Sequence, residues 1–69
     1  MFGEELKKAR KKAKQTQETL AGLANVHPTY ISHLENNKKS PTLDTLFRIC
    51  EALGTSASKL IAKVEKIKR

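Results

Sequence analysis

Start and stop signals for two short helices lie close together in the first half of the chain, and this feature restricts the fold more than any other. Thr16 can cap a helix over residues 17–24, and Asn25 suits the left-handed turn that ends it. Pro28 suits the first position of a second helix, which we predict to end near residue 36. Helices of about eight residues are unstable alone in water. These two must therefore pack on each other and on neighbouring helices.

Similar signals predict three further helices. Apolar residues recur every three or four positions over residues 2–13, a spacing typical of an amphipathic helix. Thr42 can cap a fourth helix that Gly54 ends, and Ser56 can cap a last helix that continues to about residue 67. The residues predicted to line the buried side of the fourth helix are Leu43, Leu46, Phe47, Ile49, Cys50 and Leu53. The sequence shows no strand pattern, so we predict an all-α, compact five-helix domain.

Length and composition limit the possible functions. The 69 residues allow one small domain, residues 1–69, whose core is too thin to hold a deep catalytic cleft. A single cysteine cannot form an internal disulfide, and no apolar run approaches the length of a membrane span. The net charge of +7 indicates a negatively charged partner, and the excess of Lys and Arg lies in residues 1–15 and 59–69. We therefore expect a cytoplasmic protein that has no membrane partner.

Two short helices joined by a three-residue break form a helix-turn-helix arrangement, in which the second helix enters the DNA major groove. Residues 4–62 resemble the Cro and phage-repressor-like helix-turn-helix family. The matching stretches are TQETLA at 16–21, NV at 25–26, YISHLEN at 30–36, SPTLDTL at 40–46 and ALGTS at 52–56. Thr29–Ser32 are also similar to small controller proteins of restriction–modification systems. The resemblance implies a lambda-repressor-like DNA-binding fold, with the helix-turn-helix at about 17–36.

The resemblance also implies which residues contact DNA phosphates. Gln17 matches a residue that binds a phosphate at a helix N-terminus, where backbone N–H groups and the helix dipole favour an anion. Residues 36–38 match the loop that holds the next phosphates along the backbone. The residues predicted to bind phosphate are Thr16, Gln17, Tyr30, Asn36, Asn37 and Lys38. We expect the Tyr30 side chain to be exposed and close to the DNA.

Arg10 and Glu35 match a family ion pair that joins the first helix to the end of the reading helix. If such a pair is buried, it positions groups more than it stabilises the fold. The alternative is a plain surface salt bridge, which is worth under about 1 kcal/mol.

Base recognition is expected on the exposed face of the second helix of the pair. The residues predicted to read bases are His27, Pro28, Thr29, Ser32 and His33. Pro28 departs from the family pattern, which usually has a long polar side chain at this position. Thr29 can contact a thymine methyl group, and His33 can donate to a guanine acceptor. With so few polar groups, we expect modest affinity per half-site or a contribution from DNA shape.

Together these inferences predict a sequence-specific transcriptional regulator that binds double-stranded DNA as a homodimer on a palindromic operator. Two modules that read half-sites about one helical turn apart reach a specificity that one small module cannot. The last helix, over about 56–67, carries more apolar residues than one small core needs. The residues predicted to form the dimer interface are Leu60, Ile61, Val64 and Ile67.

Two alternatives remain open. A restriction–modification controller or an antitoxin-type regulator would share the DNA-binding mechanism but differ in its target. A protein-interaction module on the same fold would have lost DNA binding, and Pro28 is the feature that favours this alternative.

We expect no enzyme, no cofactor and no small-molecule ligand. The sequence has neither a carboxylate pair in an apolar setting nor a glycine-rich phosphate loop. His27 and His33 lack a second ligand pair at a zinc-binding spacing, so no metal is predicted. Cys50 lies among apolar positions and is expected to be a buried, unreactive thiol.

Overall fold

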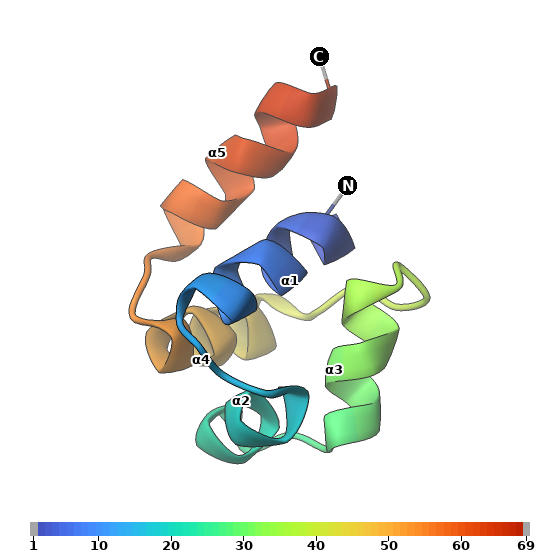
Figure 1. Ribbon diagram of the computed structural model, residues 1–69. Helices are drawn as coiled ribbons and strands as arrows, with labels where there is room; N and C mark the ends of the chain where they lie inside the picture. The colour runs from blue at the N-terminus through green and yellow to red at the C-terminus, as the bar shows by residue number, and fades with distance from the viewer. Residues whose placement is uncertain (1, 69) are drawn as a thin grey trace.

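The computed structural model describes the backbone of residues 2–68 and the side chains of residues 2–64. Within that range the chain forms α helices and no strand. The helices are α1 (Phe2–Lys12), α2 (Gln17–Ala24), α3 (Pro28–Glu35), α4 (Leu43–Leu53) and α5 (Ala57–Lys68). The all-α prediction and the predicted order of five helices are therefore confirmed, with boundaries shifted by no more than one residue. Figure 1 shows α2 and α3 at one end of the molecule and α5 at the other.

The predicted capping residues begin and end these helices. The Thr16 hydroxyl oxygen accepts a hydrogen bond from the Thr19 backbone N–H at 3.0 Å, and Thr42 caps α4 in the same way. Asn25 ends α2 with φ 58° and Gly54 ends α4 with φ 73°, both in the left-handed region. Local sequence thus determines where each helix of the motif starts and stops.

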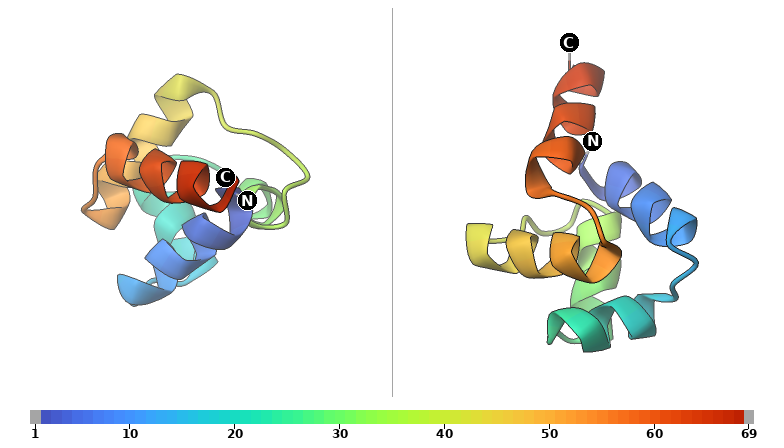
Figure 2. Two further views of the ribbon diagram at one scale, coloured as in Figure 1. Left: turned by 90° about the horizontal axis from the view of Figure 1, so that it is seen from above. Right: turned by 90° about the vertical axis from the view of Figure 1, so that its left-hand side faces the viewer.

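The core consists of two apolar clusters. The larger cluster is built from side chains of the first four helices. Its members are Leu6, Leu20, Ala21, Ala24, Ile31, Leu34 and Ile49. The smaller lies beneath α5 and contains Leu46, Cys50 and Leu60. Because α5 packs on α1 and α4, it covers the side of the core opposite α2 (Figures 1 and 2). The C-terminal half of α5 extends beyond the body of the other four helices (Figure 2).

Cys50 is only 2% exposed, in agreement with the prediction of a buried thiol. Burial raises the pKa of this thiol, because removal from water disfavours the charged thiolate.

Three apolar residues lie in surroundings that differ from the predictions. Leu43 is 67% exposed and Phe47 is 55% exposed, so they do not belong to the buried side of α4. That side is formed by positions 45, 46, 49 and 50, and the two residues lie beyond its edge. The prediction that Leu60 contributes to a dimer interface is wrong, because Leu60 is 2% exposed and packs inside its own chain.

Gly3 allows α1 to approach the backbone at the end of α3. A Cβ atom at this position would lie 2.6 Å from the Leu34 carbonyl oxygen and would also overlap the Glu35 carbonyl oxygen. The Gly3 N–H donates to the Asn37 side-chain oxygen at 2.9 Å. No side chain other than hydrogen fits there without moving one helix.

We predict opposite effects for alanine at two glycines. Gly3→Ala should lower the free energy of unfolding by about 1–3 kcal/mol, because backbone atoms of α3 must move. Gly22→Ala should raise it by about 0.5–1 kcal/mol, because an added Cβ on α2 meets no atom within 4 Å and alanine favours the helix. Urea unfolding followed by circular dichroism measures both. Equal effects of the two substitutions would contradict the close contact between α1 and α3.

Candidate nucleic-acid interface

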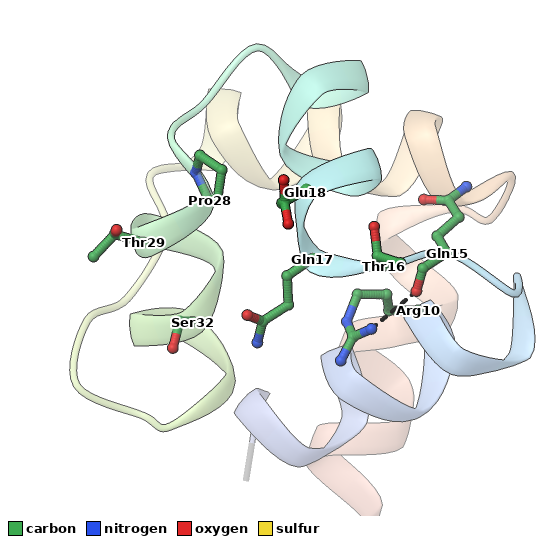
Figure 3. Close-up of a pocket in the computed structure, with 8 residues that line it drawn as sticks. All are labelled: Arg10, Gln15, Thr16, Gln17, Glu18, Pro28, Thr29 and Ser32. Carbon is green, nitrogen blue, oxygen red and sulfur yellow. Dashed lines mark hydrogen bonds between the residues drawn. The ribbon is translucent and has the colours of Figure 1, made fainter.

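An open groove with a volume of about 590 Å³ lies between the start of α2 and the outer face of α3. Its lining residues are Arg10, Gln15, Thr16, Gln17, Glu18, Pro28, Thr29 and Ser32. In Figure 3 the side chain of Gln17 reaches from α2 towards α3, where Pro28, Thr29 and Ser32 line the opposite wall. The groove therefore brings one predicted phosphate ligand next to three of the predicted base-reading residues.

A buried ion pair supports the floor of this groove. Arg10 Nε lies 2.6 Å from Glu35 Oε2, and Arg10 Nη2 lies 3.1 Å from Glu35 Oε1. The two side chains are 11% and 2% exposed, so the pair is not a surface salt bridge. Arg10 Nη1 also donates to the Gln15 backbone carbonyl at 2.9 Å. One guanidinium group thus holds α1, the end of α3 and the segment before α2 together.

The Gln17 side chain joins the same network. Its Nε2 donates to Glu35 Oε1 at 3.0 Å, so the carboxylate accepts hydrogen bonds from both Arg10 and Gln17. An amide nitrogen carries two hydrogens, which leaves Gln17 one donor for a ligand in the groove. Glu35 therefore fixes the orientation of a side chain that was predicted to bind phosphate.

The N-terminus of α2 has backbone donors that no capping group uses. Thr16 accepts from the Thr19 N–H, and the first N–H of the helical ladder is that of Leu20. The N–H groups of Gln17 and Glu18 precede that ladder and make no hydrogen bond with the described residues. Such donors, together with the helix dipole, favour an anion.

The N-terminus of α3 differs in this respect. Pro28 has no N–H, the Thr29 N–H donates to His27 Nδ1 at 3.1 Å, and the Tyr30 N–H donates to the His27 carbonyl at 3.0 Å. The first turn of α3 thus has no backbone donor left for a phosphate. The geometry separates a helix start with unused backbone donors on α2 from one on α3 that offers a ligand side chains only.

The predicted base-reading residues lie on α3 or at its start. His27 and Thr29 are exposed, whereas Pro28, Ser32 and His33 are half-buried. The Asn36 side chain donates to the Ser32 carbonyl at 2.9 Å, which links the reading face to the loop after α3.

Two of the predicted phosphate-binding residues have structural roles. Asn37 Nδ2 donates to Glu4 Oε1 at 2.7 Å, and Asn37 Oδ1 accepts from the Gly3 N–H, so this side chain fastens the loop to α1. The Asn37 amide holds the pKa of the Glu4 carboxyl below its usual range.

Tyr30 is half-buried and packs against the larger apolar cluster, so the expectation of an exposed ring is wrong. Its position beside Ile31 lets the ring cover the edge of the core.

Lys7 is a candidate phosphate contact that the sequence patterns did not single out. It lines a second hollow of about 350 Å³ together with Gln17 and Asn36, two predicted phosphate ligands. The available signal was its position three residues before Arg10, which places both side chains on similar faces of α1. Lys38, which was predicted for the same task, is exposed.

The described residues contain no group of three or more His, Cys, Asp or Glu side chains arranged to hold a metal ion. None of the helices in the described part of the chain is long and apolar enough to cross a bilayer.

A family profile and a known relative both match most of this chain. The sequence profile of the helix-turn-helix family matches residues 6–60. The control protein C.MunI of Mycoplasma sp is 39% identical over 66 residues, which cover 94% of this chain and 89% of that protein.

Two solved structures are also similar. The restriction-modification controller protein C.AhdI from Aeromonas hydrophila has a TM-score of 0.83 at 27% identity, covering 86% of this chain and 89% of its own. The P22 c2 repressor in complex with a synthetic operator has a TM-score of 0.81 at 30% identity, covering 87% and 91%.

We predict that removing the charge of one partner of the buried pair strongly lowers the free energy of unfolding. Glu35→Gln keeps the shape of the side chain but leaves the Arg10 charge unpaired, and it should lower the free energy of unfolding by about 3–5 kcal/mol. The control is Lys8→Met, which removes an ion pair to Glu5 whose lysine is 74% exposed and should cost under about 1 kcal/mol. Chemical unfolding of both variants tests this, and a loss for Glu35→Gln as small as that for Lys8→Met would contradict it.

Proposed function

Because the chain belongs to the helix-turn-helix family of DNA-binding transcriptional regulators, we propose that it reads a palindromic operator sequence-specifically as a homodimer. The predicted resemblance to Cro, phage-repressor-like and controller proteins is confirmed by the family match and by these relatives. The chain binds double-stranded DNA, and the proposal concerns how its residues do so.

One observation carries the proposal: the groove joins two uncapped backbone N–H groups at the start of α2 to the side chains of Pro28, Thr29 and Ser32 on α3. Phosphate contacts fix the register of a protein on the duplex, and base contacts supply the sequence information. In this arrangement the α2 start and Gln17 hold a phosphate while Thr29 and Ser32 face the major groove. Lys7 and Asn36 line a neighbouring hollow with Gln17, and we propose that they and the exposed Lys38 extend the phosphate contacts.

The dimer surface that we propose combines α4 and α5. Leu43, Phe47 and Ile61 are exposed apolar side chains, and Val64 is half-buried. Leu43 and Phe47 lie one turn apart on α4, which packs against α5. Ile67, which was also predicted for this interface, lies outside the described side chains. Exposed apolar groups gathered on neighbouring helices are typical of an interface with another protein surface.

The role of a restriction–modification controller is the finer proposal. C.MunI is named a control protein, and C.AhdI is described as a restriction-modification controller protein. This chain matches most of the length of each. An antitoxin-type regulator remains the second candidate within the same mechanism. A module that binds only proteins is disfavoured by the groove that sets the backbone donors of the α2 start beside side chains of α3. We further propose that residues 1–69 act as one domain, in the cytoplasm and without enzymatic activity.

Selection of bound duplexes from a random DNA pool tests sequence-specific recognition. We expect one palindromic consensus for the wild-type chain. Gln17→Ala should weaken binding to all duplexes alike by about tenfold or more, because it removes a phosphate contact and exposes Glu35 to the groove. Thr29→Ala should instead change the base preference at one position of each half-site. A wild-type protein that selects no consensus at physiological salt would refute the proposal.

The dimer surface is tested by sedimentation. Phe47→Glu places a charge on the proposed interface and should give particles near the monomer mass of 7.7 kDa, with weaker operator binding. Leu23→Glu is the matched control, because Leu23 is a similarly exposed apolar side chain, 62% exposed, on a helix outside the proposed interface. A Phe47→Glu protein that sediments as the wild type would place the interface elsewhere.

A further inference from the structure

His27 has two ring nitrogens, and the fold uses only one of them. Nδ1 accepts a hydrogen bond from the Thr29 backbone N–H at 3.1 Å, as the N-cap of α3. A nitrogen that accepts a hydrogen bond carries no proton, so the proton of the neutral ring is on Nε2. The residue itself is exposed. The cap therefore selects one tautomer and leaves a single outward group, the Nε2–H donor.

The neighbouring residues offer no comparable donor. Pro28 has neither a side-chain donor nor an N–H, and Ser32 Oγ lies 3.4 Å from the Asn36 amide that donates to it. The Thr29 hydroxyl can act as donor or acceptor and rotates freely between the two. At the start of the reading helix, His27 is thus the residue whose hydrogen-bonding character is fixed by the fold.

Two ligand atoms of DNA suit such a donor: a phosphate oxygen or an acceptor on a base. The structure favours the base. A phosphate at a helix start is held by backbone N–H groups together with side chains, and the backbone donors in the first turn of α3 are absent at Pro28 or engaged at Thr29 and Tyr30. The N-terminal residues of a reading helix also lie closest to the base edges.

We propose that His27 is a specificity-determining residue that donates from Nε2 to guanine O6 or N7, an inference that rests on the function proposed above. Guanine presents two acceptors in the major groove, whereas cytosine presents an amino donor. A side chain fixed as a donor therefore rejects cytosine, and it favours guanine with two acceptors over adenine and thymine with one each. A histidine free to exchange tautomers would not discriminate in this way.

The two uses of His27 are separable by substitution. In His27→Asn the side-chain oxygen can accept from the same Thr29 N–H, because asparagine is a strong N-cap residue, while its remaining amide donor lies closer to the backbone than Nε2 does. His27→Ser keeps a cap with an even shorter side chain. His27→Ala removes the cap as well and reports its contribution to stability. Urea unfolding of each variant shows which of them retain the wild-type fold.

The test is a repeated selection from the random duplex pool with the wild type, His27→Asn and His27→Ser. We expect the cap-retaining variants to select the wild-type consensus except at one position of each half-site, where the preference for guanine over cytosine falls about tenfold. Their unfolding midpoints should match the wild type. Binding to a duplex with that guanine–cytosine pair inverted should weaken for the wild type and be unchanged for the variants.

Two results would overturn the inference. An unaltered consensus with uniformly weaker binding to every duplex would assign Nε2 to a phosphate, and an unaltered consensus with unaltered affinity would leave His27 as a cap only. In both cases the proposed function would stand, because an operator was selected. If the wild-type chain selects no consensus, both the proposed function and this inference fail.

Discussion

The buried pair between Arg10 and Glu35 is the interaction on which the DNA-facing part of the structure depends. Two charges removed from water are costly to bury, and their mutual attraction with additional hydrogen bonds offsets that cost. What the pair supplies is position: α1, the segment before α2, the Gln17 side chain and the end of α3 all meet at these two groups. The close contact at Gly3 fastens α1 to the same end of α3. A chain with a thin core thereby holds two short helices in a fixed relation.

That fixed relation presents two helix starts whose free hydrogen-bond donors differ. Thr16 caps α2 from its side chain and leaves two backbone donors for a phosphate. His27 and Pro28 begin α3 so that its first turn has no such donor and offers a ligand side chains only. In the proposed function, the basic residues near both ends of the chain add a salt-sensitive attraction to any duplex, and the side chains of α3 add the sequence preference.

Much of this fold was predictable, because caps and stops are local. Thr16 caps the start of α2 with its hydroxyl group, as its side chain predicts. Asn25 and Gly54 end their helices in the left-handed conformation that these residue types tolerate. The packing of Leu43, Phe47 and Leu60 was not, because helical spacing indicates an apolar face but not its width or the helix that covers it. Nor could local patterns show that the Asn37 amide would be engaged by α1, since that contact joins residues 33 and 34 positions apart. The family resemblance indicated the site positions, and the hydrogen bonds of the structure show which of their donors and acceptors are already engaged.

The central claim is that α2 starts with phosphate-binding amides whereas α3 does not. Titration of the ¹⁵N-labelled protein with its selected operator and with an unrelated duplex tests this most directly, residue by residue. The backbone amide signals of Gln17 and Glu18 should shift downfield with both duplexes, while those of Thr29 and Tyr30 change little with the unrelated one. Amide shifts of equal size at the starts of both helices, or at α3 alone, would contradict the account.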